Sequence, residues 1–157
     1  MSPERPNPVQ VIVGAAIVAD GRVLACARTR PPELAGLWEF PGGKVEPGES
    51  ERDAVVRECR EELDVEVEVA EQVGPSAPLA GGHAVLRVYR ASLRAGAVPR
   101  SSEHGELRWL AADELDTVPW LPADAPIVAA LRPLLREAAA ADRARDAGRR
   151  RSAPRPS

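Results

Sequence analysis

Acidic side chains recur at helical spacing in the middle of the chain. Glu58, Glu61 and Glu62 lie three and four residues apart, which places all three on one face of a helix. Clustering like charges in this way is costly unless a cation offsets it. Hard divalent cations favour oxygen ligands, and Mg²⁺ is usually bound by a few carboxylates together with substrate phosphates. We therefore predict that these three carboxylates converge on a divalent cation.

A glycine-rich segment precedes this helix and carries the only lysine of the chain, Lys44. Gly42 and Gly43 allow the backbone to approach a ligand closely, and a lysine beside exposed amides complements phosphate oxygens. The simpler alternative is a solvated acidic surface, because residues 46–71 hold eleven acidic residues and three arginines, a net charge of −8. The full pattern G-x₅-E-x₇-R-E-U-x-E-E-x-x-U over residues 43–65, where U is apolar, favours the metal and phosphate site.

The elements that must position these residues follow from hydrophobic periodicity and turn signals. Asp20-Gly21 predicts a tight hairpin turn, and Ser50 predicts the N-cap of the acidic helix. Strands are expected at residues 9–18, 22–27, 38–41, 65–71, 84–93 and 107–110, helices at 50–63, 112–115 and 126–140, and loops at 28–37 and 74–82. This order predicts an α/β fold with a mixed sheet.

Length and composition predict one domain with a short segment at each end. The 157 residues are 44% apolar and 29% charged, which is ordinary for a globular domain. We expect a flexible N-terminus at 1–8, a catalytic domain at 9–140, and a disordered Arg- and Pro-rich tail at 141–157 with a net charge of +4. No apolar run reaches the ~20 residues that span a bilayer. With no secretory signal and two cysteines in apolar or helical contexts, we expect a cytoplasmic protein.

The segment GGKVEPGESERDAVVRECREELDV resembles the Nudix box, and residues 9–135 are similar to a MutT-type Nudix hydrolase. The resemblance implies an α/β/α sandwich with a mixed β-sheet and a catalytic loop–helix. It implies a pyrophosphohydrolase that uses Mg²⁺, with Mn²⁺ as the alternative. For MutT-like members, the expected products are a nucleoside monophosphate and pyrophosphate.

The same resemblance assigns roles to individual residues. The metal ligands would be Gly42, Glu58, Glu61, Glu62 and Glu103. The general base would be Glu58 or Glu103, a choice that the sequence leaves open, and Glu106 lies close to Glu103. Phosphate contacts would come from Arg28 and Lys44. The structural brace of the site would comprise Gly43, Glu49 and Arg57.

Two residues depart from what the resemblance leads us to expect. Asp64 occupies the position of the family's helix-ending glycine, and we expect it to adopt the left-handed conformation at a cost of at most about 1 kcal/mol. Cys59 occupies a usually aliphatic position. It is a small buried hydrophobe or, in the sharper alternative, a nucleophile, which the neighbouring carboxylates disfavour.

The nucleobase preference is less well defined. Asp124, in LPADAPIV, matches a base-reading position, and the rings of Trp38 and Trp120 could either stack on a base or pack in the core. An ionised Asp accepts hydrogen bonds only, which suits the exocyclic amine of cytosine, whereas a protonated one could read an oxidised guanine. RTRPPELAGLWEFPGGK with LPADAPIV looks closest to members that accept dCTP and 5-methyl-dCTP, some of which hydrolyse 8-oxo-dGTP.

Alternative functions stay open at this point. A Nudix hydrolase of a nucleotide sugar or dinucleoside polyphosphate fits the same box, and a non-catalytic nucleotide-sensing regulator is the second alternative. We expect a nucleoside triphosphate substrate, no membrane partner, no specific nucleic-acid binding, and a monomer or homodimer. The arginines of the tail are either a solvated appendage or a nucleic-acid contact.

Overall fold

The computed structural model describes residues 8–101 and 105–152. Its strands are β1 Gln10–Ala19, β2 Arg22–Ala27, β3 Trp38–Glu39, β4 Gly42–Lys44, β5 Val67–Leu79, β6 Ala84–Leu93 and β7 Leu107–Leu110. The helices are α1 Glu51–Leu63 and α2 Ala125–Ser152, with short 3₁₀ helices η1 Pro32–Leu34, η2 Ala80–Gly82, η3 Ala112–Thr117 and η4 Pro122–Asp124. Nearly all of the N-terminal segment predicted to be flexible, and Glu103, lie outside the described residues.

One mixed sheet forms the centre of the protein. Its strand order is β3-β2-β1-β6-β5, and β4 and β7 pair with β1 and β2 off this path. β1 and β6 are parallel, whereas the other pairs are antiparallel. The opposite edge of β1 is shared, because residues 12–14 pair with β4 and residues 18–19 pair with β2. β4 therefore lies beside the N-terminal half of β1.

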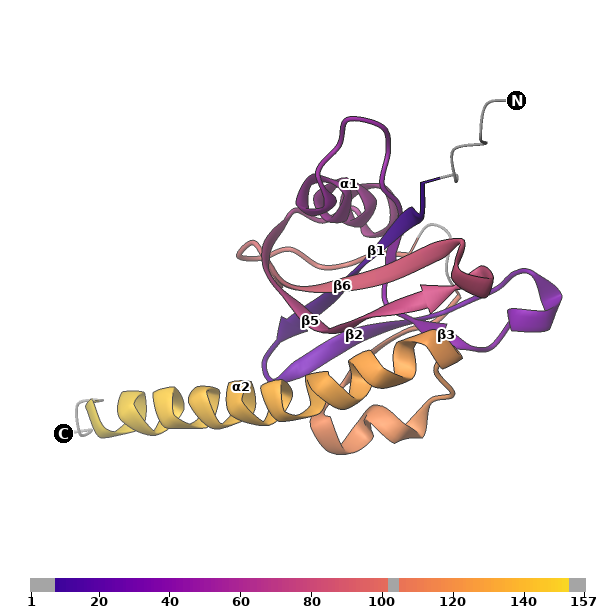
Figure 1. The fold of residues 1–157 in the computed structure, drawn as a ribbon. Coiled ribbons are helices and arrows are strands. Elements are labelled where there is room, and N and C mark those ends of the chain that lie inside the picture. Colours follow the sequence, from indigo (N-terminus) through magenta and orange to yellow (C-terminus); the bar gives the residue numbers. More distant parts are fainter. Residues whose placement is uncertain (1–7, 102–104, 153–157) are drawn as a thin grey trace, which may run out of the picture.

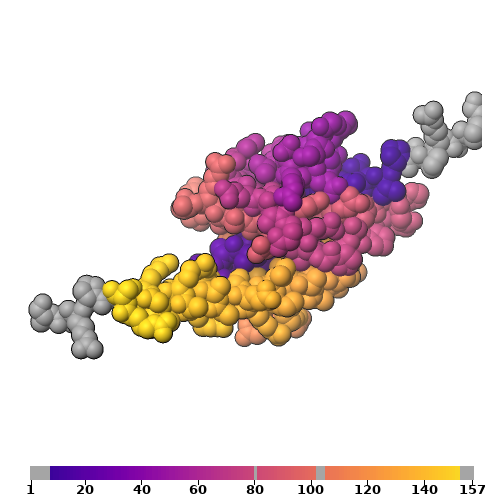
Figure 2. Space-filling model, turned by 60° about the vertical axis from the view of Figure 1, so that its left-hand side comes forward, coloured from indigo at the N-terminus to yellow at the C-terminus, as the bar shows by residue number. Residues whose placement is uncertain are grey.

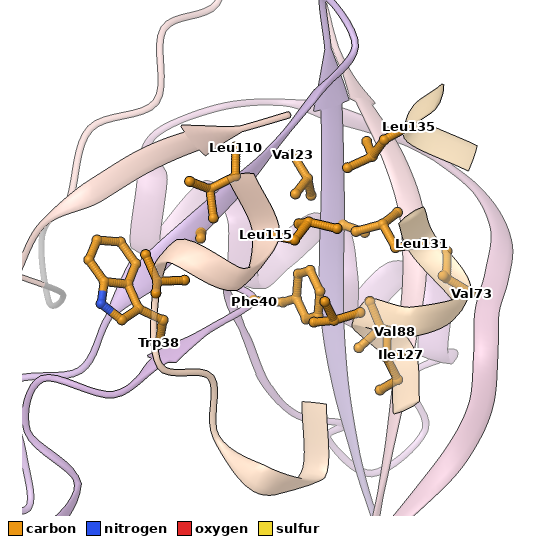
Figure 3. Packing of buried hydrophobic residues seen from close by; sticks show 14 of the residues in the cluster. Val23, Trp38, Phe40, Val73, Val88, Leu110, Leu115, Ile127, Leu131 and Leu135 are labelled. Carbon is orange, nitrogen blue, oxygen red and sulfur yellow. The ribbon is translucent and has the colours of Figure 1, made fainter. Parts of the chain in front are cut away.

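A helical layer covers each face of this sheet (Figure 1). One core lies between the sheet and α1 and includes Val55, Cys59 and Leu63. The other lies between the sheet and α2 with η3, where Ile127, Leu131 and Leu135 are fully buried (Figure 3). Burying such side chains stabilises the fold by about 1.5–3 kcal/mol each. The α/β/α sandwich with a mixed sheet is therefore confirmed.

Local signals were correct where the chain reverses or a helix starts and ends. Asp20 and Gly21 both have positive φ values, 52° and 72°, as a type I′ hairpin turn requires. The hydroxyl of Ser50 accepts a hydrogen bond from the Asp53 backbone amide at 3.1 Å, so it caps α1. Asp64 adopts the left-handed conformation at φ 55°, ψ 42°, as predicted.

Two segments predicted as loops are strands. A loop was predicted at 74–82, but residues 74–79 belong to β5, which continues along β6 as far as Leu79. Two register shifts, between Val69 and Gln72 and between Val73 and Ala77, accommodate the residues that do not pair regularly. The glycine-rich segment forms β4. A side chain at Gly42 would collide with the Val13 carbonyl, so this pairing with β1 depends on glycine.

The C-terminal segment also differs from the prediction, because α2 continues to Ser152 instead of ending near residue 140. Its buried residues stop at Leu135, and its last turns extend beyond the rest of the molecule in Figures 1 and 2. Alanine and arginine are strong helix formers, and an ion pair between Asp142 and Arg145 adds a contact at i,i+3 spacing. Local propensity therefore extends the helix without a core. Across the described part of the chain, no helix has the length and apolar character to cross a membrane.

Candidate active site

α1 presents its acidic residues beside β4 because the two ends and one face of the helix are fixed. Ser50 caps its start, Asp64 ends it, and Val55, Cys59 and Leu63 bury the face towards the sheet. Glu58 and Glu62 flank this buried face, with 13% of the Glu58 side chain and 8% of residue Glu62 exposed. The helix therefore holds two carboxylates at the boundary between the core and the surface.

Arg57 ties the helix to the segment that precedes it. Its guanidinium donates to both carboxylate oxygens of Glu49, at 2.8 and 3.0 Å, and to the carbonyl of Lys44 at 3.0 Å. The hydrogen bond to Glu49 raises the pKa of Arg57 above its usual value, and the same bond lowers the pKa of Glu49. Both groups therefore stay charged, and the contact links the end of β4 to the middle of α1.

The glycines of β4 leave room for two of the acidic side chains. A side chain at Gly43 would collide with the carboxylate of Glu58. The backbone amide of Gly42 donates to Oε2 of Glu62 at 3.2 Å. Glycine at both positions thus allows the carboxylates of α1 to approach the β4 backbone.

The three carboxylates predicted to share one helix face differ in their exposure. Glu61 points outwards, with 58% of its side chain exposed, and accepts a hydrogen bond from Arg57 at 3.2 Å. In residues 8–101 and 105–152, no three acidic, histidine or cysteine side chains are grouped so that they could hold a metal ion as they stand. The same Nη1 atom of Arg57 donates to Oε1 of Glu58 at 3.0 Å, so this guanidinium bridges Glu58 and Glu61 on the predicted helix face. Glu58 and Glu62 still provide oxygen donors next to space that only glycine leaves open, so the residues fit a hard divalent cation.

A cavity of about 1050 Å³ is lined by Glu62 of α1 together with residues of the sheet, η4 and loop 28–37. Its size suits a nucleotide. Its lining includes Gly42, Gly43, Lys44 and Glu62 together with Arg28, Glu39, Phe40 and Asp124. Apolar residues complete the walls: Ile12, Leu34, Ala77, Leu79, Leu86 and Leu121.

The predicted phosphate contacts, Arg28 and Lys44, both line the cavity, but in different surroundings. Nη1 of Arg28 lies 2.9 Å from Oε2 of Glu39, and only 31% and 19% of the two side chains are exposed. Sequence reasoning missed Glu39. A signal was present, because an acidic residue between the aromatic residues Trp38 and Phe40 stands where a charge rarely occurs without a partner.

Asp124, the predicted base-reading residue, is buried in the cavity wall with 3% of its surface exposed. Burial raises the pKa of Asp124 to about 7, the carboxylate of Glu39 adds to this, and the guanidinium of Arg28 offsets part of it. Near neutral pH this carboxyl group therefore exists in both protonation states.

The structure places neither of the predicted stacking tryptophans in the cavity wall. Trp38 is buried beneath the guanidinium of Arg108, 5.0 Å from its ring centroid. Trp120 stacks on Phe40 at 5.0 Å, and its Nε1 donates to the Leu115 carbonyl at 2.8 Å. Among the aromatic residues of the described chain, Phe40 is the one that lines the cavity. In this structure both tryptophan rings therefore pack against other residues of the protein.

Cys59 provides no nucleophile in this arrangement. Burial raises the pKa of Cys59 to about 12, and the carboxylates of Glu62 and Glu58 add to the effect. Because the thiolate is the reactive form, the thiol is inert near neutral pH. Its role is that of a small hydrophobic residue in the core between α1 and the sheet.

The family follows from comparison with known proteins. The NUDIX domain model matches residues 8–131. The chain belongs to the Nudix family. A "Putative 8-oxo-dGTP diphosphatase 2" of Mycobacterium tuberculosis is 47% identical over 134 residues, which cover 83% of this chain and 94% of that protein. The "CTP pyrophosphohydrolase" of Escherichia coli is 40% identical over 129 residues, with 78% and 91% covered.

A solved structure agrees with these relatives. The solution structure of the E. coli ORF135 protein superposes with a TM-score of 0.69 at 37% identity, covering 80% of this chain and 90% of that one. The predictions of the family, its fold and its enzyme class are therefore confirmed: the chain is a MutT-like Nudix pyrophosphohydrolase. Nudix hydrolases generally need a divalent metal ion. The assignment of particular residues to that ion is still a prediction.

Proposed function

We propose that this Nudix hydrolase cleaves nucleoside triphosphates to a monophosphate and pyrophosphate with Mg²⁺, and that it acts on cytosine nucleotides and 8-oxo-dGTP in nucleotide-pool sanitation. One observation carries the proposal. One cavity is lined both by Lys44 and Glu62, next to the glycines of β4, and by the polar side chains of Glu39 and Asp124. The names of the two relatives, an 8-oxo-dGTP diphosphatase and a CTP pyrophosphohydrolase, support the same pair of substrates.

The box carboxylates Glu58, Glu61 and Glu62, with the Gly42 carbonyl, would hold Mg²⁺. When bound, the ion supplies charge neutralisation at the phosphates and a more acidic water. Nη1 of Arg57 bridges Glu58 and Glu61 in the structure, and both carboxylates would keep oxygen lone pairs for the ion. Glu58 would accept the proton of the attacking water. Glu103, outside the described residues, is the alternative base and a fifth candidate ligand.

Asp124 would read the nucleobase together with Glu39. Its ionised form accepts a hydrogen bond from an exocyclic amine, as on cytosine N4, and its protonated form donates one to a carbonyl oxygen. Because the pKa of Asp124 is raised to about 7, both forms are available near neutral pH. This supports acceptance of two base types by one cavity.

A hydrolysis panel tests the proposal. We would incubate the protein with Mg²⁺ and dCTP, 5-methyl-dCTP, dGTP or 8-oxo-dGTP, and measure pyrophosphate and orthophosphate separately. We expect pyrophosphate from the cytosine nucleotides and 8-oxo-dGTP, and less from dGTP. Hydrolysis of a nucleotide sugar or dinucleoside polyphosphate, with no pyrophosphate from any triphosphate, would contradict the proposal and favour the other Nudix substrates.

A further inference from the structure

Six charged side chains line the cavity, and four of them either contact a polar partner or are buried. Arg28 pairs with Glu39, Glu62 accepts from the amide of Gly42, and Asp124 is buried. Two cations differ: within the part of the chain that the structure describes, Arg30 and Lys44 make no side-chain hydrogen bond or ion pair. The cavity therefore presents two uncompensated positive charges, from loop 28–37 and from β4.

The backbone around Arg30 is fixed although its side chain is exposed. The amide of Arg28 donates to the Leu37 carbonyl at 2.8 Å, and the amide of Gly36 donates to the Arg28 carbonyl at 2.9 Å, which closes the loop. Nε of Arg28 donates to the carbonyl of Arg30 at 3.2 Å. Ordering Arg30 on a ligand would therefore cost mainly side-chain freedom.

We propose that Arg30 is a substrate-binding residue that, together with Lys44, holds the phosphate chain of the nucleotide, while Arg28 is retained by its ion pair with Glu39. The inference rests on the proposed function. A guanidinium can bind phosphate oxygens in a bidentate manner, whereas an ammonium acts as a point charge. The two cations complement the charge of a polyphosphate, and they approach it from separate elements.

A contact of this kind acts on binding more than on the chemical step. The phosphate chain carries its charge both before and during cleavage, so the interaction is similar in the ground state and the transition state. Losing such a contact raises KM and leaves kcat nearly unchanged. For an exposed charge-assisted hydrogen bond, we expect a rise in KM of about tenfold.

The test compares Arg30→Gln and Arg30→Lys with Arg136→Gln. Arg136 is an exposed arginine of α2 that does not line the cavity, so its replacement removes the same charge elsewhere. Two quantities are measured for each protein: KM and kcat for dCTP with Mg²⁺, and the affinity for inorganic tripolyphosphate with Mg²⁺ by calorimetry. Tripolyphosphate has no nucleobase, so its affinity reports on phosphate binding alone.

We expect Arg30→Gln to raise KM and weaken tripolyphosphate binding, Arg30→Lys to restore part of both, and Arg136→Gln to change neither. An unchanged KM and tripolyphosphate affinity in Arg30→Gln would overturn the inference even if dCTP is hydrolysed. Equal weakening in Arg136→Gln would also overturn it, because a general charge effect would then suffice. If no triphosphate is hydrolysed, the proposed function fails, and tripolyphosphate binding alone decides the role of Arg30.

Discussion

Asp124 is the residue whose chemistry departs most from its ordinary behaviour. A buried carboxyl group with a raised pKa binds its proton more tightly in the folded state than in the unfolded state. Its contribution to stability is therefore greatest at low pH and falls as pH rises from about 4 to 7. The full shift corresponds to roughly 4 kcal/mol, as an upper bound.

We expect the difference in unfolding free energy between Asp124→Asn and the unsubstituted protein to move in favour of the mutant as pH rises from 5 to 8. The reason is that Asn cannot ionise and so avoids the cost of a buried negative charge. Urea denaturation at the two pH values measures this difference. Asp146→Asn, at an exposed site of α2, is the control. A difference that is the same at both pH values would show that Asp124 titrates normally.

Substitutions of Glu58 and Glu62 test the catalytic and metal-binding roles that we propose for these carboxylates. We expect Glu58→Gln or Glu62→Gln to lower kcat by about 10²–10⁴-fold or more, because each amide is isosteric but lacks the charge and basicity of the carboxylate. Steady-state kinetics measure the loss, and circular dichroism checks that the fold persists. Glu68→Gln, exposed on β5, should retain full activity. Near-normal turnover in both site variants would refute the assignment.

The roles of single residues were only partly predictable from the sequence. Helical spacing predicted that Glu58, Glu61 and Glu62 lie on one face of a helix, since that relation is local. Their approach to the glycines of β4 joins residues 15 and more positions apart. The contacts of Arg57 join α1 to Glu49 and Lys44, and the position of Glu39 follows from the pairing of β3 with β2. Such relations join distant segments, so periodicity does not contain them. For Trp38 and Trp120, the contacts in the structure favour the packing alternative over stacking on a base.

Among the elements, α1 ends at a residue type that adopts the left-handed conformation less readily than glycine does. Asp64 holds a left-handed conformation that glycine adopts at no steric cost. We expect Asp64→Gly to stabilise the protein by up to about 1 kcal/mol, which corresponds to a rise in Tm of about 2–4 °C. Calorimetry measures the change. Asp146→Gly, in the right-handed backbone of α2 beyond its last buried residue, should not raise Tm. A lower Tm for Asp64→Gly would mean that the Asp side chain contributes more than its conformation costs.

Element boundaries were well predicted where they depend on local sequence and poorly predicted where they depend on pairing between strands. β2, β6 and β7 begin and end at the predicted residues, and α1 starts next to its predicted cap. β4 has three residues and little intrinsic preference for a strand, so it exists because β1 offers an edge. The second half of β5 contains Gly74, Pro75 and Pro78, which resemble a loop, but bulges accommodate them against β6.

For the whole molecule, elements on both faces of the sheet contribute residues to the cavity. α1 carries the carboxylates, while η4 and the first turn of α2 contribute Asp124 and Pro126. The remainder of α2 lies on the second core as far as Leu135, and the arginine-rich end continues without buried residues. The catalytic domain therefore does not need the last part of this helix.

We expect deletion of all residues after Ala140 to leave kcat and KM for dCTP unchanged and to lower stability only slightly. Residues 141–152 contribute no buried side chain, whereas Ala139 still packs against Gly21 in the truncated chain. Enzyme kinetics and thermal unfolding of the two chains provide the comparison. A shorter chain that ends before Leu135 loses a fully buried leucine and should be strongly destabilised. Lost activity with an intact fold after the longer truncation would give the arginine-rich end a part in catalysis.

The continuity of η4 with α2 constrains how such an enzyme could change its substrate during evolution. A change in the position of Asp124 would shift α2, whose next turns fill the main core. A new nucleobase preference that arose in this way would therefore disturb folding. Loop 28–37 contributes to the same cavity yet contains no fully buried side chain, and substitutions there spare the core. Divergence among descendants should therefore accumulate first in that loop.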